Sequence, residues 1–191
     1  MLRGDWAGAE AAFLESHRVG WNPQPGLALL LAERGQVASA ERQLERSLTQ
    51  PGWIDGQRKG TLLAVLARIR AMAGHVEGAA QALEQLAAGP ELCVTRACEA
   101  ERERARGELA WARGDLSEAE RALRSAVALW LETNARVHAA HVRLRLFELL
   151  LAVDDRFGAE LELKSAQTVF EEVGAEPMVE RCRRASSVQA E

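Results

Sequence analysis

Residues 114–130 read GDLSEAERALRSAVALW, a short turn followed by an amphipathic helix. The apolar side chains recur three and four positions apart and so form one stripe on a helix. They are Leu116, Ala119, Ala122, Leu123, Ala126, Val127 and Trp130. Gly114 can adopt the positive φ that ends the preceding helix, and Asp115 can cap the next one. The stretch therefore predicts a corner between two helices.

The same corner returns along the chain, beginning at Gly4, Gly35, Gly74, Gly114 and Asp154. The first interval is the shortest, and the other three differ by no more than one position. Each copy has a small residue five positions after its start and a large apolar residue four positions later. The small residues are Ala9, Ala40, Ala79, Ala119 and Ala159, and the large ones are Phe13, Leu44, Leu83, Leu123 and Leu163. Small residues let helices approach closely, and a regular period of this size indicates stacked helix pairs.

Strand signals are almost missing, and we expect ten helices. Their predicted ranges are 5–19, 26–34, 36–49, 56–73, 75–88, 91–113, 115–131, 134–153, 156–173 and 177–187. Tight turns are expected within each pair, and helix breakers between pairs. The breakers are residues 21–26, Pro51-Gly52-Trp53, residues 88–90, Thr133-Asn134 and residues 174–177.

The composition restricts the class of protein. The 191 residues are 48% hydrophobic and 27% charged, with a net charge of −4. Acidic and basic residues alternate in EAERER (residues 99–104), which predicts a solvated helix face with ion pairs rather than a basic face for nucleic acid. Three cysteines make neither a disulfide framework nor a zinc pattern, so we expect free thiols in a reducing cytoplasm. No apolar run of about 18 residues predicts a membrane span.

The repeat resembles a known family. Gly4-Asp5-Trp6, followed by Ala9 and Phe13, is similar to the second half of the tetratricopeptide repeat, a helix–turn–helix unit of about 34 residues. NPQPGLALLLAERG (residues 22–35) and the segments 161–166 and 169–177 resemble the helical-repeat region of large bacterial LuxR-type transcriptional regulators. Abundant alanine, and arginine in place of lysine, also suggest a GC-rich bacterial genome.

The resemblance implies an all-α fold, a right-handed superhelix of antiparallel helix pairs with about four and a half units, a TPR-like α-solenoid. The repeat array would cover residues 1–176, and a capping helix and tail would cover 177–191. In the LuxR-type family a DNA-binding domain follows such a region. The sequence ends at Glu191 and has no phosphate-binding loop, so DNA binding and nucleotide hydrolysis are not carried over. We expect a fragment of a larger regulator or a stand-alone derivative.

The predicted function is a non-catalytic protein or peptide-interaction scaffold, the regulatory or signal-sensing region of such a regulator. A free-standing TPR-like adaptor unrelated to transcription is the alternative. An enzyme would need a pocket with a titrating cluster, which the sequence does not show. The expected partner is a protein, a peptide or a small effector, with no cofactor, no direct nucleic-acid binding and no membrane.

No catalytic residues or metal site are predicted. His138 and His141 share a helix face, but no third ligand is near in sequence, so a pair in the groove is favoured over a metal site. Cys93 and Cys98 are expected to be small buried hydrophobes rather than catalytic thiols.

The inner groove supplies the main candidate site, because the first helix of each pair lines it. Counting back from each turn by the family's groove positions selects Arg68, Met72, Arg104, Glu108, Trp111, His141, Leu144 and Glu148. Trp111 is the predicted anchor, since tryptophan and arginine dominate binding hot spots. The alternative is that Trp111 packs between helices, as tryptophan usually does.

Trp6 and Phe13 form a second candidate, a terminal docking face. The helix that would pair with theirs is missing before Gly4, so we expect their apolar face to be open. Exposed apolar patches of that size favour self-association through the N-terminal end.

Overall fold

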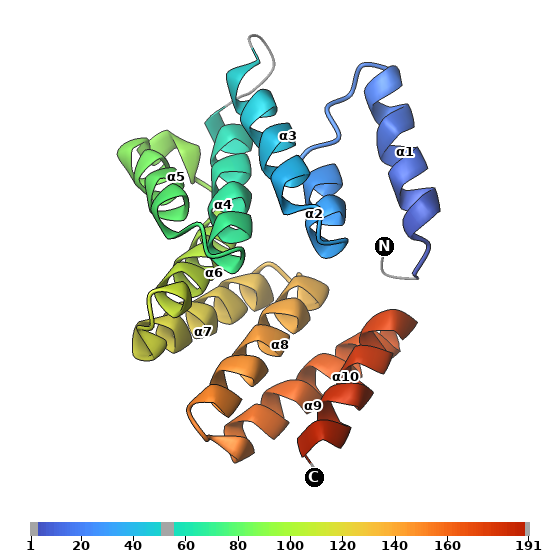
Figure 1. The fold of residues 1–191 in the computed structure, drawn as a ribbon, viewed down its shortest axis with the longest axis vertical. Coiled ribbons are helices and arrows are strands. Elements are labelled where there is room, and N and C mark those ends of the chain that lie inside the picture. Colours follow the sequence, from blue (N-terminus) through green and yellow to red (C-terminus); the bar gives the residue numbers. More distant parts are fainter. Residues whose placement is uncertain (1–3, 51–55, 190–191) are drawn as a thin grey trace.

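The computed structural model describes residues 4–50 and 56–189, so the predicted breaker at Pro51-Gly52-Trp53 lies outside the described residues. The described part is all-helical and contains no strand, which confirms the predicted fold class at that level (Figure 1). Its elements are α1 (Trp6–Arg18), α2 (Gly26–Glu33), α3 (Val37–Thr49), α4 (Gly56–Met72), α5 (Val76–Ala88), the 3-10 helix η1 (Pro90–Leu92), α6 (Arg96–Ala112), α7 (Leu116–Glu132), α8 (Arg136–Ala152), α9 (Arg156–Glu172) and α10 (Glu176–Gln189).

The helix predicted over 91–113 is wrong at its start. Residues 90–92 form η1, and α6 begins only at Arg96. Thr95 has an extended backbone, and its hydroxyl accepts a hydrogen bond from the Cys98 amide at 3.2 Å. Threonine at this position caps the helix, which fixes the later start.

One turn geometry joins most neighbouring helices. Among the described residues, seven have a positive φ just after the C-cap of a helix: Gly20, Gly35, Gly74, Gly114, Asn134, Asp154 and Gly174. In each turn the next amide donates to a carbonyl five positions back, as from Asp115 to Ala110 at 2.9 Å and from Ala135 to Trp130 at 2.9 Å. The breakers expected at 133–134 and 174–177 are therefore the same tight turn as those within pairs. As a result, the starts of α6 to α10 are evenly spaced, at 96, 116, 136, 156 and 176.

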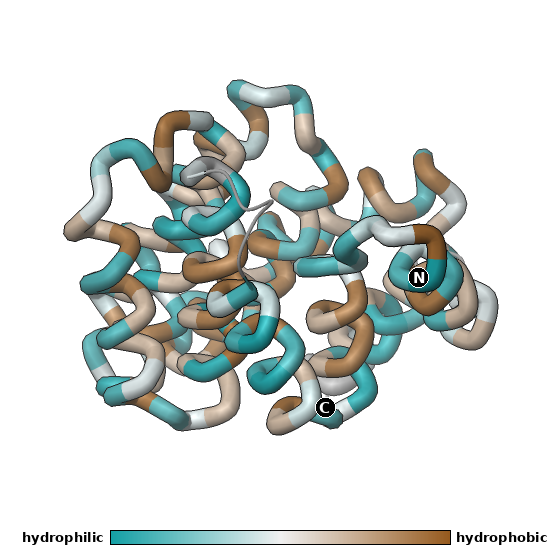
Figure 2. Tube along the Cα trace, turned by 90° about the horizontal axis from the view of Figure 1, so that it is seen from above, coloured by the Kyte–Doolittle hydropathy of each residue, from teal (hydrophilic) through white to brown (hydrophobic). Residues whose placement is uncertain are grey.

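The hydrophobic core passes along the chain from neighbour to neighbour. One cluster joins α1 to α4, a second joins α6, α7 and α8, and a third joins α8, α9 and α10. Hydrophobic and hydrophilic stretches alternate along the helices, as expected where each helix has one face in the core (Figure 2). The predicted small residues Ala40, Ala79, Ala119 and Ala159 are fully buried.

Close approach of helices depends on small residues in the core. A Cβ added to Gly107 of α6 would lie 2.7 Å from the Leu123 side chain of α7. A Cβ added to Gly60 of α4 would overlap the carbonyl oxygen of Leu92 in η1. Both glycines therefore let the neighbouring element pack directly against the helix backbone.

The terminal docking face is not open, and this expectation was wrong. Trp6 and Phe13 are half-buried and pack, with Ala9, on the cluster that includes α2. A Cβ added to Gly26 at the start of α2 would lie 2.5 Å from the Phe13 ring. The helix α2 thus covers the apolar face of α1.

The first described turn also approaches α10. A Cβ added to Gly4 would lie 3.0 Å from Cγ of Pro177, in the first turn of α10. In Figure 1 the start of α1 lies near the upper end of α10. The start of the described chain therefore lies against the start of its last helix, while the C-terminal end of α10 lies far from it (Figure 1). None of the described helices is long and apolar enough to cross a membrane.

Candidate binding cavity

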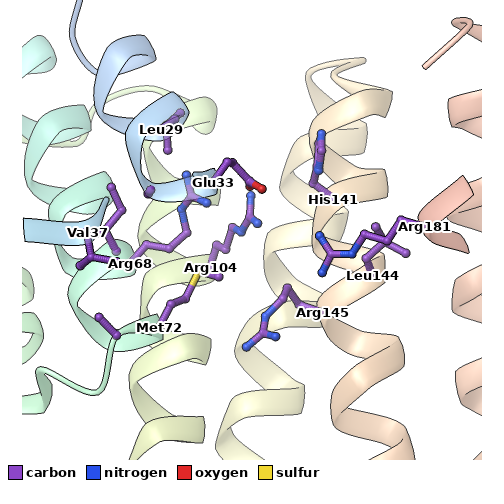
Figure 3. A pocket seen from close by; sticks show the side chains of 13 residues that line it. Leu29, Glu33, Val37, Arg68, Met72, Arg104, His141, Leu144, Arg145 and Arg181 are labelled. Atoms are coloured by element: carbon purple, nitrogen blue, oxygen red, sulfur yellow. The ribbon is translucent and has the colours of Figure 1, made fainter. Parts of the chain in front are cut away.

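A cavity of about 290 Å³ opens between alternate helices (Figure 3). We call it the central cavity. Its lining comes from α2, α4, α6, α8 and α10, with Val37 of α3 and with Ala73 after α4. The lining residues are Leu29, Ala32, Glu33, Val37, Arg68, Ile69, Met72, Ala73, Arg104, His141, Leu144, Arg145 and Arg181.

Most of the predicted groove residues lie on this surface. Five of the eight line the central cavity: Arg68, Met72, Arg104, His141 and Leu144. They come from α4, α6 and α8, the first helices of three predicted pairs. Met72 is 51% exposed there, so an apolar side chain is accessible at the edge of the cavity.

The other three predicted residues contact the cavity wall through Arg145. Glu108 accepts hydrogen bonds from Arg145 at 2.7–3.2 Å, and its side chain is only 1% exposed. Glu148 pairs with Arg145 and, at 2.9 Å, with Arg181 of α10. The Arg145 guanidinium lies 4.3 Å from the ring centroid of Trp111.

Trp111 itself does not line the central cavity. It is half-buried against the core cluster of α6, α7 and α8. Trp111 therefore packs between helices, which is the alternative considered from the sequence. The Arg145 guanidinium covers the Trp111 ring in a cation–π contact. Burial alone would lower the pKa of Arg145, but its bonds to Glu108 raise that pKa above the ordinary value.

Arg68 is held by a buried ion pair. Its Nε lies 2.5 Å from Oε1 of Glu101, and the exposed fractions of the two side chains are 9% and 8%. Burial alone would raise the pKa of Glu101, but the guanidinium groups of Arg68 and Arg104 outweigh it and hold this pKa below its ordinary value. Glu101 is therefore ionised, and its carboxylate is held in the ion pair with Arg68.

Arg104 differs from the other cavity arginines. It is 8% exposed, its Nε has no hydrogen-bond acceptor, and no ion pair joins it to another described residue. Burial and then the neighbouring Arg68 lower the pKa of Arg104 to about 10, so it is still charged at neutral pH. A buried charge without a bonded partner destabilises the fold by several kcal/mol, because the ion has lost its hydration.

A second hollow, of about 250 Å³, adjoins the central cavity. We call it the side hollow. The two share Leu29, Glu33, Arg68, Arg104 and His141. Trp130 also lines the side hollow, and its buried Nε1 is a second donor without an acceptor.

The two histidines of α8 make ring contacts rather than a metal site. His138 stacks on Trp130 with ring centroids 4.5 Å apart, and His141 meets Phe170 edge-on at 5.1 Å. Burial, followed by the charges of Arg104 and Arg68, lowers the pKa of His141 to about 3. His141 is therefore neutral at physiological pH. The described histidine, cysteine and acidic side chains form no group of three that could hold a metal ion.

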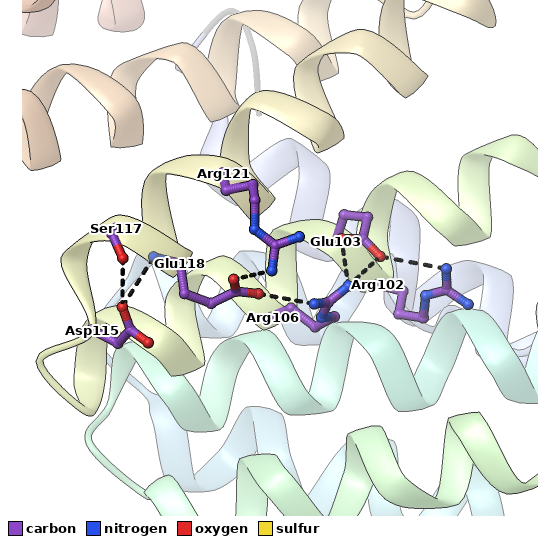
Figure 4. A network of polar contacts seen from close by, with 7 residues as sticks. All are labelled: Arg102, Glu103, Arg106, Asp115, Ser117, Glu118 and Arg121. Atoms are coloured by element: carbon purple, nitrogen blue, oxygen red, sulfur yellow. Dashed lines mark hydrogen bonds and ion pairs between the residues drawn. The ribbon is translucent and has the colours of Figure 1, made fainter.

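The expectation of a solvated face over residues 99–104 was wrong in part. Glu101, Glu103 and Arg104 are buried, because α6 packs against α4, α5 and α7. The half-buried Glu99 and Arg102 do carry ion pairs, with Arg96 at 2.7 Å and with Glu103 at 3.4 Å. Just after this segment, Arg106 bonds Glu103 at 2.9 Å within α6 and Glu118 of α7 at 2.9 Å (Figure 4).

The cysteines behave mainly as predicted. Cys98 and Cys182 are buried and Cys93 is half-buried, all as free thiols. Burial raises the pKa of both buried thiols, so neither is activated as a nucleophile.

Sequence reasoning missed Arg145, Arg181 and Glu33 as cavity residues. Arg145 follows His141 by four positions, so helical spacing alone could have placed it on the same face. Glu33 and Arg181 lie on α2 and α10. Nothing local in the sequence indicates that these helices meet around one cavity.

Comparison with known proteins gives a similarity of fold. No family model matches the sequence, and no curated protein matches it. Among solved structures, the chain is similar to the crystal structure of BtubC (BKLC) from P. vanneervenii, with a TM-score of 0.55 and 17% sequence identity. The similarity covers 99% of this chain and 92% of that one. At this identity it concerns the fold alone.

Proposed function

We propose that this chain is a non-catalytic interaction scaffold whose inner surface binds a peptide, a partner protein or a small effector. We further propose that its helices form a right-handed superhelix of antiparallel pairs, about four and a half TPR-like units. One observation carries the proposal: every second helix from α2 to α10 contributes to the lining of the central cavity. Such a surface is typical of the inner face of a helical-repeat array.

The experiment is a selection of binding peptides from a random library displayed on phage, followed by affinity measurement. Met72→Asp places a charge in the central cavity. Leu161→Asp is the matched control, because Leu161 is 57% exposed on α9, against 51% for Met72, and does not line the cavity. Peptides should bind Met72→Asp at least about tenfold more weakly, because the variant no longer buries a methionine side chain against the peptide.

Two results would contradict this proposal. One is a selection that enriches no peptide. The other is equal peptide affinity for the wild type and Met72→Asp. Loss of affinity in Leu161→Asp alone would move the binding surface to α9.

We also propose that the chain acts in the regulatory region of a bacterial LuxR-type transcriptional regulator, in the cytoplasm. The support is the resemblance of residues 22–35, 161–166 and 169–177 to that family. Sequencing the gene on both sides tests it. A reading frame that continues into a DNA-binding domain supports the regulator, whereas stop codons on both sides favour a free-standing adaptor.

A further inference from the structure

The charges around the central cavity do not pair completely. Three of its four arginines have a carboxylate: Arg68 pairs with Glu101, Arg145 with Glu108 and Glu148, and Arg181 with Glu148. The Arg104 side chain lies among them, 8% exposed, with a buried Nε that has no acceptor and with no ion pair to another described residue. A buried ionic group of this kind normally has a hydrogen-bonded partner.

A second donor without a partner adjoins the same space. Trp130 lines the side hollow together with Arg104, and its buried Nε1 lacks an acceptor. Two buried donors around one hollow therefore find no acceptor among the described residues, and a bound group with oxygen atoms could supply one.

We propose that the central cavity binds a small organic oxyanion, a phosphate ester or a carboxylate, whose oxygens bond to Arg104. This inference rests on the proposed function, because it takes the same inner surface as the binding surface. The planar guanidinium presents a fork of N–H donors that matches the oxygens of a phosphate or a carboxylate. The charges of Arg68, Arg145 and Arg181 are balanced by Glu101, Glu108 and Glu148, so Arg104 is the cavity arginine left to bind the ligand.

The dimensions favour a small molecule. The central cavity and the side hollow have volumes of about 290 and 250 Å³, close to the lower limit of small-molecule sites. Leu29 and Leu144 form apolar wall beside the arginines, and Trp130 lies at the far side. The expected ligand is therefore an anionic group joined to a compact apolar or aromatic body.

Glu33 is the one acidic residue that lines the central cavity. Figure 3 shows its carboxylate and the Arg104 guanidinium directed toward the same space. No ion pair joins them among the described contacts, and Glu33 is exposed. Its negative charge opposes an incoming anion, so removing that charge should strengthen anion binding.

The experiment titrates the full chain with inorganic phosphate, and separately with acetate, against sodium chloride at the same ionic strength. The readout is the NMR signal of the Arg104 Nε–H group, together with backbone amide shifts. Phosphate should give saturable shifts centred on Arg104, and acetate reports whether a carboxylate also binds. Both outcomes, phosphate alone or both anions, support the oxyanion site.

Three variants test the assignment. Arg104→Met should weaken phosphate binding about tenfold or more, because it removes the charge-assisted hydrogen bonds to the anion. Arg121→Met removes the same charge from an exposed side chain on α7, outside the cavity, and should bind phosphate within about twofold of the wild type. Glu33→Gln should bind phosphate a few-fold more tightly.

If neither phosphate nor acetate gives shifts beyond those of chloride in the wild type, the inference is overturned. Equal affinity in Arg104→Met and Arg121→Met also overturns it. If Arg104→Met does not fold, unchanged or weaker phosphate affinity in Glu33→Gln overturns it instead. If phosphate binds at Arg104 but no peptide is selected, the anion site is supported and the peptide scaffold is contradicted. If peptides are selected but no anion binds at Arg104, only the anion site is contradicted.

Discussion

Replacing Arg104 by methionine is expected to make the unliganded protein more stable. Arg104 is 8% exposed, its buried Nε has no acceptor and it has no ion pair to another described residue, whereas Glu101 and Glu108 are already paired with Arg68 and Arg145. Removing the guanidinium therefore leaves no carboxylate without a partner. A linear apolar side chain keeps much of the packing volume.

The magnitude follows from the pKa. Burial and Arg68 lower the pKa of Arg104 from its ordinary value to about 10. At about 1.36 kcal/mol for each pKa unit, holding the charged form in the folded state costs about 3 kcal/mol. The unfolded chain holds this proton more tightly, so the destabilisation is fully present below pH 10 and is relieved as the pH rises above about 10.

Methionine fills less space than arginine, so we expect a net gain of about 1–3 kcal/mol in the free energy of unfolding. In a chain of this length, the melting temperature should rise by about 2–10 °C. The assay is urea and thermal unfolding at pH 7 in chloride buffer without phosphate, with Arg121→Met as the exposed control. A loss of stability of about 1 kcal/mol or more would refute the reasoning, because it would mean that Arg104 stabilises the unliganded fold.

Three further outcomes are expected in urea unfolding. Gly60→Ala should lose at least about 2 kcal/mol, because its Cβ would overlap the Leu92 carbonyl oxygen. Glu108→Gln should lose about 3 kcal/mol, because it breaks a buried pair with Arg145. Because the pKa of His141 is about 3 when folded and about 6.5 when unfolded, its neutral form stabilises the protein above pH 6.5, and this stability is lost as pH falls toward 3. His141→Leu should therefore lose about 2–3 kcal/mol less stability than the wild type between pH 7 and 4.5.

Matched controls separate these effects from general damage. Gly35→Ala has open space around its Cβ but a φ of +75°, so it should lose only about 1 kcal/mol from backbone strain. Glu15→Gln breaks the exposed pair with Arg18 and should leave stability nearly unchanged. Equal losses in Gly60→Ala and Gly35→Ala, or in Glu108→Gln and Glu15→Gln, would contradict the packing and burial arguments. Equal loss of stability at acid pH in His141→Leu and in the wild type would contradict the argument from the pKa of His141.

The helices were predictable because the signals are local. Glycine at a left-handed turn, a capping residue and a three-and-four apolar spacing all act within one or two turns of chain, and Gly114 with Asp115 shows each of them. The late start of α6 was also predictable in principle, since Thr95 is a capping residue and the acidic Glu99 lies in the first turn after it. The equivalence of the Asn134 turn to the glycine turns was harder to find, because asparagine tolerates the left-handed region less obviously than glycine.

The sequence predicted the residues of the central cavity only where position on a helix is enough to show which side chains line it. Counting positions on first helices found Arg68, Arg104 and His141, which share the central cavity. It could not show that Glu101 and Arg104 are buried, because that depends on how closely three neighbouring helices surround α6. Trp6 and Phe13 were misjudged for the same reason, since the covering surface comes from α2 rather than from a preceding helix.

The equal spacing of helix starts from α6 to α10 limits how the chain can change in length. Removing the whole interval between two equivalent starts, such as Leu116 and Arg156, would join a helix to the beginning of an equivalent one and preserve the order of buried and exposed positions. Removing one residue inside a helix would turn everything after it by about 100°, and its apolar stripe would then face away from its neighbour. Length variation in such a protein should therefore occur in whole-helix or whole-pair steps, with single insertions confined to the corners.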